Sequence, residues 1–298
     1  DANSAAATGS LANKSAKFRF HGVSAHAAGA PWRGRSALDG VEAMNHMVNL
    51  MREHVLPDSR IHYVITSGGS APNVIPDFAE VFYYTRNPDP AEVESIFQRV
   101  VAAAEGAAMG TGTEMEYEVI HGIYNLLLNE PLARTMHQNL ERVGGVEYTP
   151  EERAFARAIQ SSFAYEVAPL ESAAQVQEFY VGRREGGGGS TDVGDVSWVV
   201  PTAGLRTATW VPGTSAHSWQ AVAAGGTSIG TKGMIVAAKT LAMTAYDLFT
   251  TPELLQEART AFDDQRGPDF EYVPLLGDRA PPLDYRASVM NEDGAGGN

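Results

Sequence analysis

Two of the eight histidines lie in loops of small residues, where an imidazole can meet a ligand. His26 stands in "VSAHAAG" and His217 in "VPGTSAHSWQ". Such a side chain can bind a metal ion, transfer a proton or stabilise a developing negative charge. For His217, a surface or capping role and a metal-ligand role are both compatible with the local sequence. The other six fall in expected strands and helices and are interpreted as structural: His21, His46, His54, His62, His121 and His137.

A glycine run leads directly into hydroxyl and carboxylate side chains. Gly186 to Gly189 precede Ser190, Thr191 and Asp192. Glycines allow a backbone to approach a ligand and donate N–H groups to it, which favours a substrate-binding turn. A plain flexible linker explains the same pattern equally well. No lysine follows the glycines at the spacing of a phosphate-binding loop.

The loop "GGSAPNVIPD" (68–77) carries a polar side chain at its tip. Asn73 offers amide donors and an acceptor, and Arg86 on the next expected strand has a planar guanidinium suited to a carboxylate. Together they predict a clamp for an anionic substrate. The alternative is an ordinary hairpin loop, the usual role of a Gly/Pro/Asn cluster.

Composition excludes several function classes. The 298 residues carry a formal charge of −14 and no cysteine. A nucleic-acid partner is therefore not expected, and any metal must be held by His, Asp or Glu. No run of about 18 apolar residues suggests a membrane span, so a soluble protein is expected. The amino terminus lacks Met and a signal peptide pattern, which predicts a fragment or processed product. The cytoplasm is the expected compartment, and the periplasm is also compatible.

The elements that must position these residues follow from periodicity and capping. The first part of the chain alternates strands and helices in the order β-α-β-β-α-β, the split-βαβ, ferredoxin-like pattern, over 16–127. Ser36 is the expected N-cap of the first helix and Asp89 that of the second. The expected elements are a strand near 16–22, a helix at 36–55, strands at 60–69 and 78–89, a helix from 89 and a strand at 113–125.

The remainder, 128 to about 265, is expected to be part of an α/β domain, followed by an extended tail over 266–298. Helices are predicted at 130–143, 231–248 and 252–266, and a strand at 204–211.

Several stretches, taken together and in order, resemble a known family. "FHGVSAHAAGAPWRGRSALDG", "GGSAPNVIPD", "GGSTDVGDVSW" and "GTSAHSWQ" are similar to segments of the di-metal amidohydrolases that include carboxypeptidase G, aminoacylase and succinyl-diaminopimelate desuccinylase. The resemblance implies a catalytic α/β domain with two metal ions, interrupted by a ferredoxin-like lid that dimerises. Residues 16–127 then correspond to the lid, and 1–15 and 128–265 to the catalytic domain.

The resemblance also implies roles for single residues. His26 matches a lid histidine that reaches across the dimer to stabilise the oxyanion. Asn73 and Arg86 match lid positions that bind the substrate carboxylate, and His217 matches the last metal ligand.

The family's other catalytic motifs have no counterpart in this sequence. An upstream His ligand, an acidic pair with the general base and a further His are absent, and Glu151 and Glu152 in "TPEERAF" are interpreted as first-turn helix charges. A catalytic zinc usually needs about three protein ligands, so this chain alone is not expected to hold the two zinc or manganese ions of a complete enzyme.

The resulting hypothesis is a metal-dependent amidohydrolase that cleaves N-acyl amino acids, such as aminobenzoyl-glutamate-like amides, with metal-activated water. This chain would contribute the lid and one ligand. Its partners would be a second lid, in a homodimer or heterodimer, and a separate chain carrying the amino-terminal catalytic half. The alternatives are a non-catalytic dimerisation fragment of the same lineage and an amino-acid-binding protein.

Overall fold

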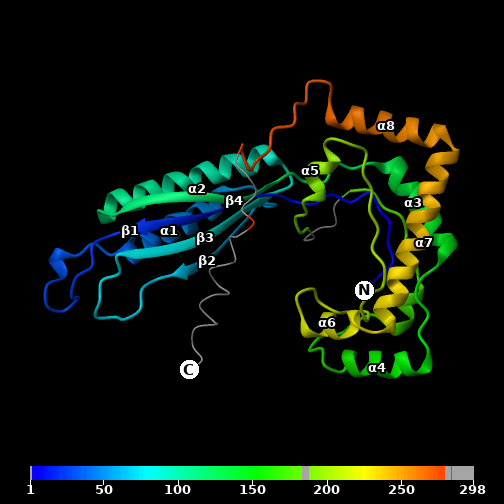
Figure 1. Ribbon diagram of the computed structural model, residues 1–298, viewed down its shortest axis with the longest axis horizontal. Helices are drawn as coiled ribbons and strands as arrows, with labels where there is room; N and C mark the ends of the chain where they lie inside the picture. Colours follow the sequence, from blue (N-terminus) through cyan, green and yellow to red (C-terminus); the bar gives the residue numbers. More distant parts are fainter. Residues whose placement is uncertain (1, 183–187, 279–282, 284–298) are drawn as a thin grey trace. The chain divides into compact units, whose positions relative to one another are not determined.

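The computed structural model describes residues 2–182, 188–278 and 283, which fall into two units. Unit 1 comprises 1–9, 127–187 and 196–270, and unit 2 comprises 10–126, 188–195 and 271–298, each as far as its residues are described. Figure 1 labels the elements of both units. Gly186 and Gly187 of the glycine run, and most of the expected tail beyond Asp278, lie outside the described residues. None of the described helices is long and apolar enough to cross a membrane.

Unit 2 is built on a four-stranded antiparallel sheet in the order β2-β3-β1-β4. Helix α1 connects β1 to β2 and α2 connects β3 to β4, which is the ferredoxin-like order. This part of the fold prediction is confirmed. The elements are β1 (Ala12–His21), η1 (Pro31–Arg33), α1 (Ala37–Met51), η2 (Arg52–His54), β2 (Arg60–Ser67), β3 (Phe78–Asn87), α2 (Pro90–Thr111) and β4 (Glu114–Ile123).

Both helices of unit 2 begin at the caps that the sequence predicts. The Ser36 hydroxyl accepts the backbone N–H of Asp39 at 3.2 Å, and the Asp89 carboxylate accepts that of Ala91 at 2.9 Å. Pro90 occupies the first turn of α2, where its missing N–H costs nothing. Gly112 ends this helix with φ 67°, a left-handed conformation that glycine adopts without strain.

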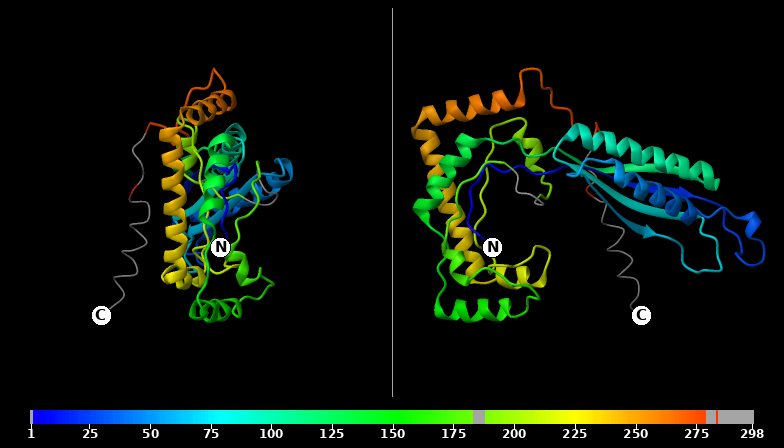
Figure 2. Two further views of the ribbon diagram at one scale, coloured as in Figure 1. Left: turned by 90° about the vertical axis from the view of Figure 1, so that its right-hand side faces the viewer. Right: turned by 180° about the vertical axis from the view of Figure 1, so that it is seen from behind.

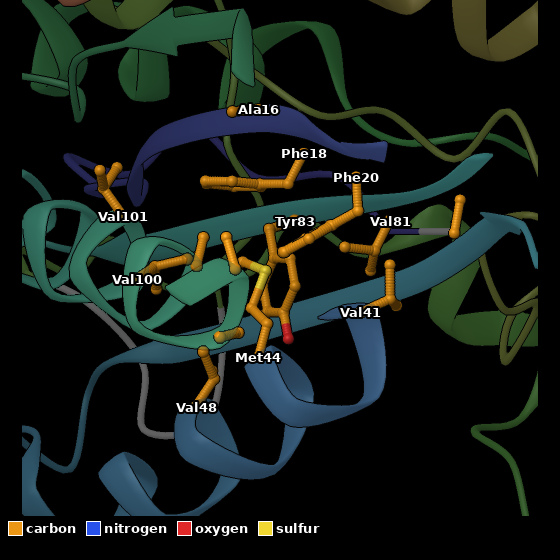
Figure 3. Close-up of a cluster of buried hydrophobic side chains, with 14 of the residues drawn as sticks. Ala16, Phe18, Phe20, Val41, Met44, Val48, Val81, Tyr83, Val100 and Val101 are labelled. Atoms are coloured by element: carbon orange, nitrogen blue, oxygen red, sulfur yellow. The ribbon is translucent and has the colours of Figure 1, made fainter. Parts of the chain in front are cut away.

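The core of unit 2 lies between the sheet and its two helices. Figures 1 and 2 show α1 and α2 on the same face of the sheet. The alternating residues of β1 and β3 point toward these helices, and Figure 3 shows Phe18, Phe20, Val81 and Tyr83 packed with side chains from both. The rings of Phe18 and Tyr83 meet edge to face with centroids 5.9 Å apart. The strand period of two therefore leaves the opposite face for polar side chains.

Unit 1 is mainly helical among its described residues. Helices α3 and α7 pack against each other and α8 packs against both. The predicted helices at 130–143 and 252–266 are confirmed to the residue, and the third begins at Ser228 rather than Thr231. The elements are α3 (Glu130–Val143), α4 (Pro150–Gln160), η3 (Leu170–Ala174), α6 (Trp219–Gly225), α7 (Ser228–Thr250) and α8 (Pro252–Arg266), and α5 (Val193–Ser197) spans the change from unit 2 to unit 1.

The predicted strand at 204–211 is not formed. Arg206 makes one antiparallel bridge to Ser4, with backbone bonds of 2.8 and 2.9 Å, and the ladder stops there. The reason is a side chain: the buried side-chain Oδ1 of Asn3 accepts the N–H of Ala208 at 2.9 Å, in place of a neighbouring strand. Among the described residues of unit 1, the sheet of the expected α/β domain is therefore present only as isolated β-bridges.

Candidate active site

The loop that carries His26 is joined to the loop that carries Asn73. His26 and Val74 form an antiparallel bridge, and the Ala27 N–H donates to the Asn73 carbonyl at 3.0 Å. The two loops follow β1 and β2 at the same end of the sheet. The structure therefore brings together two of the predicted site residues that are 47 positions apart in the sequence.

The backbone around His26 determines which ring nitrogen carries its proton. Its Nδ1 accepts the N–H groups of Ala28 at 3.2 Å and Gly29 at 3.1 Å. A nitrogen that accepts hydrogen bonds is unprotonated, so the neutral ring carries its proton on Nε2. The side chain is exposed. His26 thus presents an N–H donor at the tip of unit 2, the group that oxyanion stabilisation requires.

Arg86 lies far from Asn73 within one chain. Asn73 precedes β3, whereas Arg86 is the residue before its last, and the eight residue steps from Phe78 to Arg86 span roughly 26 Å of strand. Asn73 and Arg86 of one chain are therefore too far apart to bind the same carboxylate. The separation arises because β3 is extended between the two residues, although they are close together in the sequence.

The guanidinium of Arg86 has few partners in its surroundings. It lies over the Tyr84 ring at 5.3 Å, and its Nε is shielded from solvent without a hydrogen-bond acceptor among the described residues. A buried unpaired donor costs free energy of about 1–3 kcal/mol. Arg86 is therefore suited to accept an anionic ligand.

The face of the sheet opposite α1 and α2 carries an ion network that the sequence reasoning missed. The Glu80 carboxylate pairs with Arg19 at 2.7 Å and Lys17 at 3.2 Å, and Arg19 also pairs with Glu118 at 2.8 Å. Burial raises the pKa of Glu80, but bonds from Thr66, Arg19 and Lys17 outweigh this and hold it below its usual 4.5. The alternation in "KFRF" was the available signal, since it separates Lys17 and Arg19 from the core phenylalanines.

The turn after the glycine run places three predicted residues at the start of α5. The Thr191 hydroxyl accepts the N–H of Val193 at 3.3 Å, and the Asp192 side chain is exposed. The Ser190 hydroxyl is buried without a hydrogen-bond partner among the described residues. A Cβ at Gly194 would lie 2.0 Å from the Tyr124 carbonyl oxygen, which explains the glycine there. The turn belongs to unit 2.

Asp195 anchors this turn to the end of β4 and to the carboxyl-terminal segment. Its carboxylate accepts the Tyr272 hydroxyl at 2.7 Å and the Tyr124 N–H at 3.3 Å. Burial raises the pKa of Asp195, and the two hydrogen bonds offset part of that rise. Tyr272 was not identified from the sequence, because it lies in a segment that was expected to be an extended tail. The segment around it instead packs on unit 2, where the Tyr124 hydroxyl donates to the Val273 carbonyl at 3.0 Å.

His217 belongs to unit 1 and has an uncommon backbone conformation. Its φ of 60° makes it the single non-glycine residue with positive φ in the described chain. The loop before it is fixed by Gln160 and Tyr165, which donate to the carbonyls of Pro212 at 3.0 Å and Gly213 at 3.1 Å. The His217 side chain is exposed. Left-handed backbone costs a residue with a Cβ about 1–2 kcal/mol, so packing holds His217 in a strained position typical of functional sites.

The acidic pair near residue 150 is a helix-capping feature, as predicted. Thr149 and Glu152 form a reciprocal capping box at the start of α4. Glu152 is buried and also bonds Ser228 and Lys232, whereas Glu151 is exposed. In the described part of the chain, no group of three or more His, Asp or Glu side chains could hold a metal ion. These residues therefore do not fit a metal by themselves, and His217 can supply one ligand at most.

Comparisons with known proteins identify the domain that unit 2 contains and the proteins that the chain resembles. Residues 8–111 match the model of the peptidase dimerisation domain. One subunit of the p-aminobenzoyl-glutamate hydrolase of Escherichia coli (strain K12) is 39% identical, over 85% of this chain and 57% of that protein. Residues 8–111 therefore carry this dimerisation domain, and the chain is similar in sequence to a hydrolase subunit. The resemblance recognised from the sequence motifs is thereby confirmed.

More distant relatives are also hydrolases. The Xaa-Arg dipeptidase of Mus musculus is 29% identical, over 85% of this chain and 52% of that protein. The crystal structure of an amidase of the hydantoinase/carbamoylase family from Burkholderia vietnamiensis matches with TM-score 0.50 and 15% identity, over 79% of this chain and 49% of that chain. This last likeness shows the fold alone. The chain spans about half the length of the curated relatives it matches.

Proposed function

We propose that this chain supplies the dimerisation domain, the substrate carboxylate site and one metal ligand of an amidohydrolase that cleaves N-acyl amino acids. The observation that carries the proposal is the donor at His26, whose Nε2–H is exposed while Nδ1 is held by two backbone amides. The name of the E. coli relative supports p-aminobenzoyl-glutamate as the substrate to test.

A second copy of the chain resolves the separation of Asn73 and Arg86. Strand β2 is an edge strand, and its exposed apolar side chains include Val64 and Ile65. Such an edge is suited to pairing with another strand. The Arg60 end of β2 lies beside Arg86 in the strand register, and its other end leads into the loop of Asn73. Antiparallel pairing of two β2 strands about a two-fold axis therefore places the tip loops of one copy at the Arg86 end of the other.

In such a dimer the roles of this chain's side chains follow from their chemistry. Arg86 binds the carboxylate of the amino-acid product, because its fork matches two carboxylate oxygens. His26 and Asn73 of the second copy donate to the scissile carbonyl oxygen as negative charge develops on it. Ser190, Thr191 and Asp192 contact the substrate from the glycine-rich turn. A metal bound by His217 with ligands from outside the described residues would supply the activated water.

Mixed dimers test the composite site. The assembled enzyme is this chain with a polypeptide that supplies the part of the E. coli relative to which it does not align. His26→Ala and Arg86→Ala chains should each be inactive in the release of p-aminobenzoate from p-aminobenzoyl-glutamate. Their mixture should regain about a quarter of wild-type activity, because half the dimers are mixed and each then has one intact site.

A matched control separates the composite site from one confined to a single chain. A His26→Ala/Arg86→Ala double variant mixed with wild-type chain leaves one defect in every site of the mixed dimer, so those dimers should add no activity. If the two single variants do not complement each other, the composite site is wrong. Binding of acyl amino acid without turnover by any assembly would instead favour the amino-acid-binding alternative.

A further inference from the structure

Three arginines gather at the Arg86 end of β2 and β3 in a chain whose net charge is −14. Arg60 and Arg86 are direct partners in the strand register, and Arg52 donates to the Ile61 carbonyl beside them. None of the three forms an ion pair with a described carboxylate. Like charges directly opposite each other destabilise a sheet.

Asn13, Arg86 and Arg60 lie opposite one another on three neighbouring strands, and this row contains two buried polar atoms without partners among the described residues. Asn13 on β1 is paired with Arg86, which is paired with Arg60. Asn13 is only 3% exposed, and its Oδ1 has no hydrogen-bond donor, while Nε of Arg86 has no acceptor. An unpaired acceptor beside an unpaired cation is complementary to a ligand that carries an N–H next to a carboxylate, as an N-acyl amino acid does.

A cleft at the edge strand adjoins this row at Arg60. Arg52, Val55, Ser59, Arg60, Ile61 and His62 line a space of about 320 Å³. Arg60 uses Nη1 to fix the turn before β2, with bonds of 2.7 and 2.8 Å to the Pro57 and Ser59 carbonyls. Its Nε and Nη2 make no hydrogen bond with the residues that the structure describes. Burial and the charges of Arg86, Arg52 and Arg60 lower the pKa of His62, which records the positive potential in the cleft.

We propose that Arg60, assisted by Arg52, binds the side-chain carboxylate of an N-acylated dicarboxylic amino acid whose α-carboxylate is bound by Arg86. This inference rests on the proposed function and names its substrate class. Opposed residues on adjacent strands lie about 5 Å apart, a separation of the same order as that between the two carboxylates of glutamate. Two arginines side by side are thereby neutralised by two carboxylates of one molecule.

The first test compares two substrates in the assembled enzyme. p-Aminobenzoyl-glutamine differs from p-aminobenzoyl-glutamate only by the lost side-chain charge. Arg60→Gln should lower kcat/KM for the glutamate substrate by about 10- to 100-fold and leave the glutamine substrate nearly unchanged. Arg259→Gln, an exposed arginine on α8 of unit 1, is the matched control and should change neither. Equal losses on both substrates with Arg60→Gln would overturn the proposal.

The second test uses the 298-residue chain without turnover. N-acetylglutamate should raise the pKa of His62, followed by NMR of its ring, because the bound carboxylates offset the arginine charges. N-acetylglutamine should raise it less, and Arg60→Gln should abolish the difference. If inorganic phosphate acts as strongly as N-acetylglutamate, the cleft is a general anion site and the proposal is wrong. If N-acetylglutamate raises the pKa of His62 more than N-acetylglutamine does, but the assembly hydrolyses neither amide, the proposed function is wrong and the dicarboxylate site stands.

Discussion

Glu152 offers the sharpest test of the structure of unit 1, because the neighbouring Glu151 is a built-in control. The Glu152 carboxylate is 9% exposed and accepts the Thr149 N–H at 2.7 Å, the Ser228 hydroxyl at 2.6 Å and the Lys232 ammonium at 2.7 Å. Hydrogen bonds to a charged group contribute about 1.5–3 kcal/mol each, and the share of the half-exposed Lys232 is smaller. We expect Glu152→Ala to lower the free energy of unfolding by about 3 kcal/mol.

Urea denaturation followed by tryptophan fluorescence measures this loss. Three of the four tryptophans, Trp198, Trp210 and Trp219, belong to unit 1. With a urea dependence of about 2 kcal/mol per molar, the midpoint should fall by roughly 1.5 M. Glu151→Ala should leave it nearly unchanged. Equal effects of the two substitutions, or loss of bound metal with an unchanged midpoint, would refute the assignment of this pair to helix capping.

The pH dependence of the same variant has a defined sign. Burial raises the pKa of Glu152, but bonds from Lys232, Ser228 and Thr149 lower it further, to below its usual 4.5. The carboxylate therefore stabilises the fold above its unfolded pKa, and this contribution disappears as the pH falls through the lower folded pKa. The difference between wild type and Glu152→Ala should be full at pH 7 and should shrink below 4.5. A constant difference from pH 7 to pH 3 would contradict the charged contacts.

Two further substitutions test the loops that carry the candidate site. His217→Gly removes the proposed ligand and relieves the left-handed backbone at this position. It should leave the urea midpoint of unit 1 unchanged or raise the free energy of unfolding by up to about 1 kcal/mol. A marked loss of stability would argue for a structural role. Tyr272→Phe should destabilise the Asp195 turn, which is measured as faster amide hydrogen exchange at Val193 and Gly194. The difference from wild type should diminish at low pH, where the raised pKa of Asp195 leaves its carboxyl protonated. The same difference from wild type at all pH values would contradict this.

The regular elements of unit 2 were predictable because their signals are local. Ser36 and Asp89 cap the two helices by contacts only a few residues long. The alternation in β1 and β3 identifies the core face in the same way. Topology followed from the order of the elements, since the split-βαβ pattern allows few sheet arrangements.

The errors concern residues whose placement depends on distant partners. The expected strand at 204–211 fails because Asn3, some 200 positions away, takes the Ala208 N–H. The distance between Asn73 and Arg86 within one chain was not foreseen, because it depends on the length of β3. Tyr272 was missed because its contact with Asp195 spans 77 residues and leaves no pattern around either one. The row Asn13–Arg86–Arg60 could be found only once the register of three strands was known.

Hydrolysis and metal content, measured on the same samples, test the central claim most directly. Alone, the 298-residue chain should release no p-aminobenzoate from p-aminobenzoyl-glutamate. Assembled with the complementing polypeptide and zinc or manganese, it should do so. His217→Ala in that assembly should lower both bound metal and hydrolysis, whereas Ser215→Ala in the same loop should lower neither. Turnover by the chain alone, or wild-type metal content and rate in the His217→Ala assembly, would contradict the account.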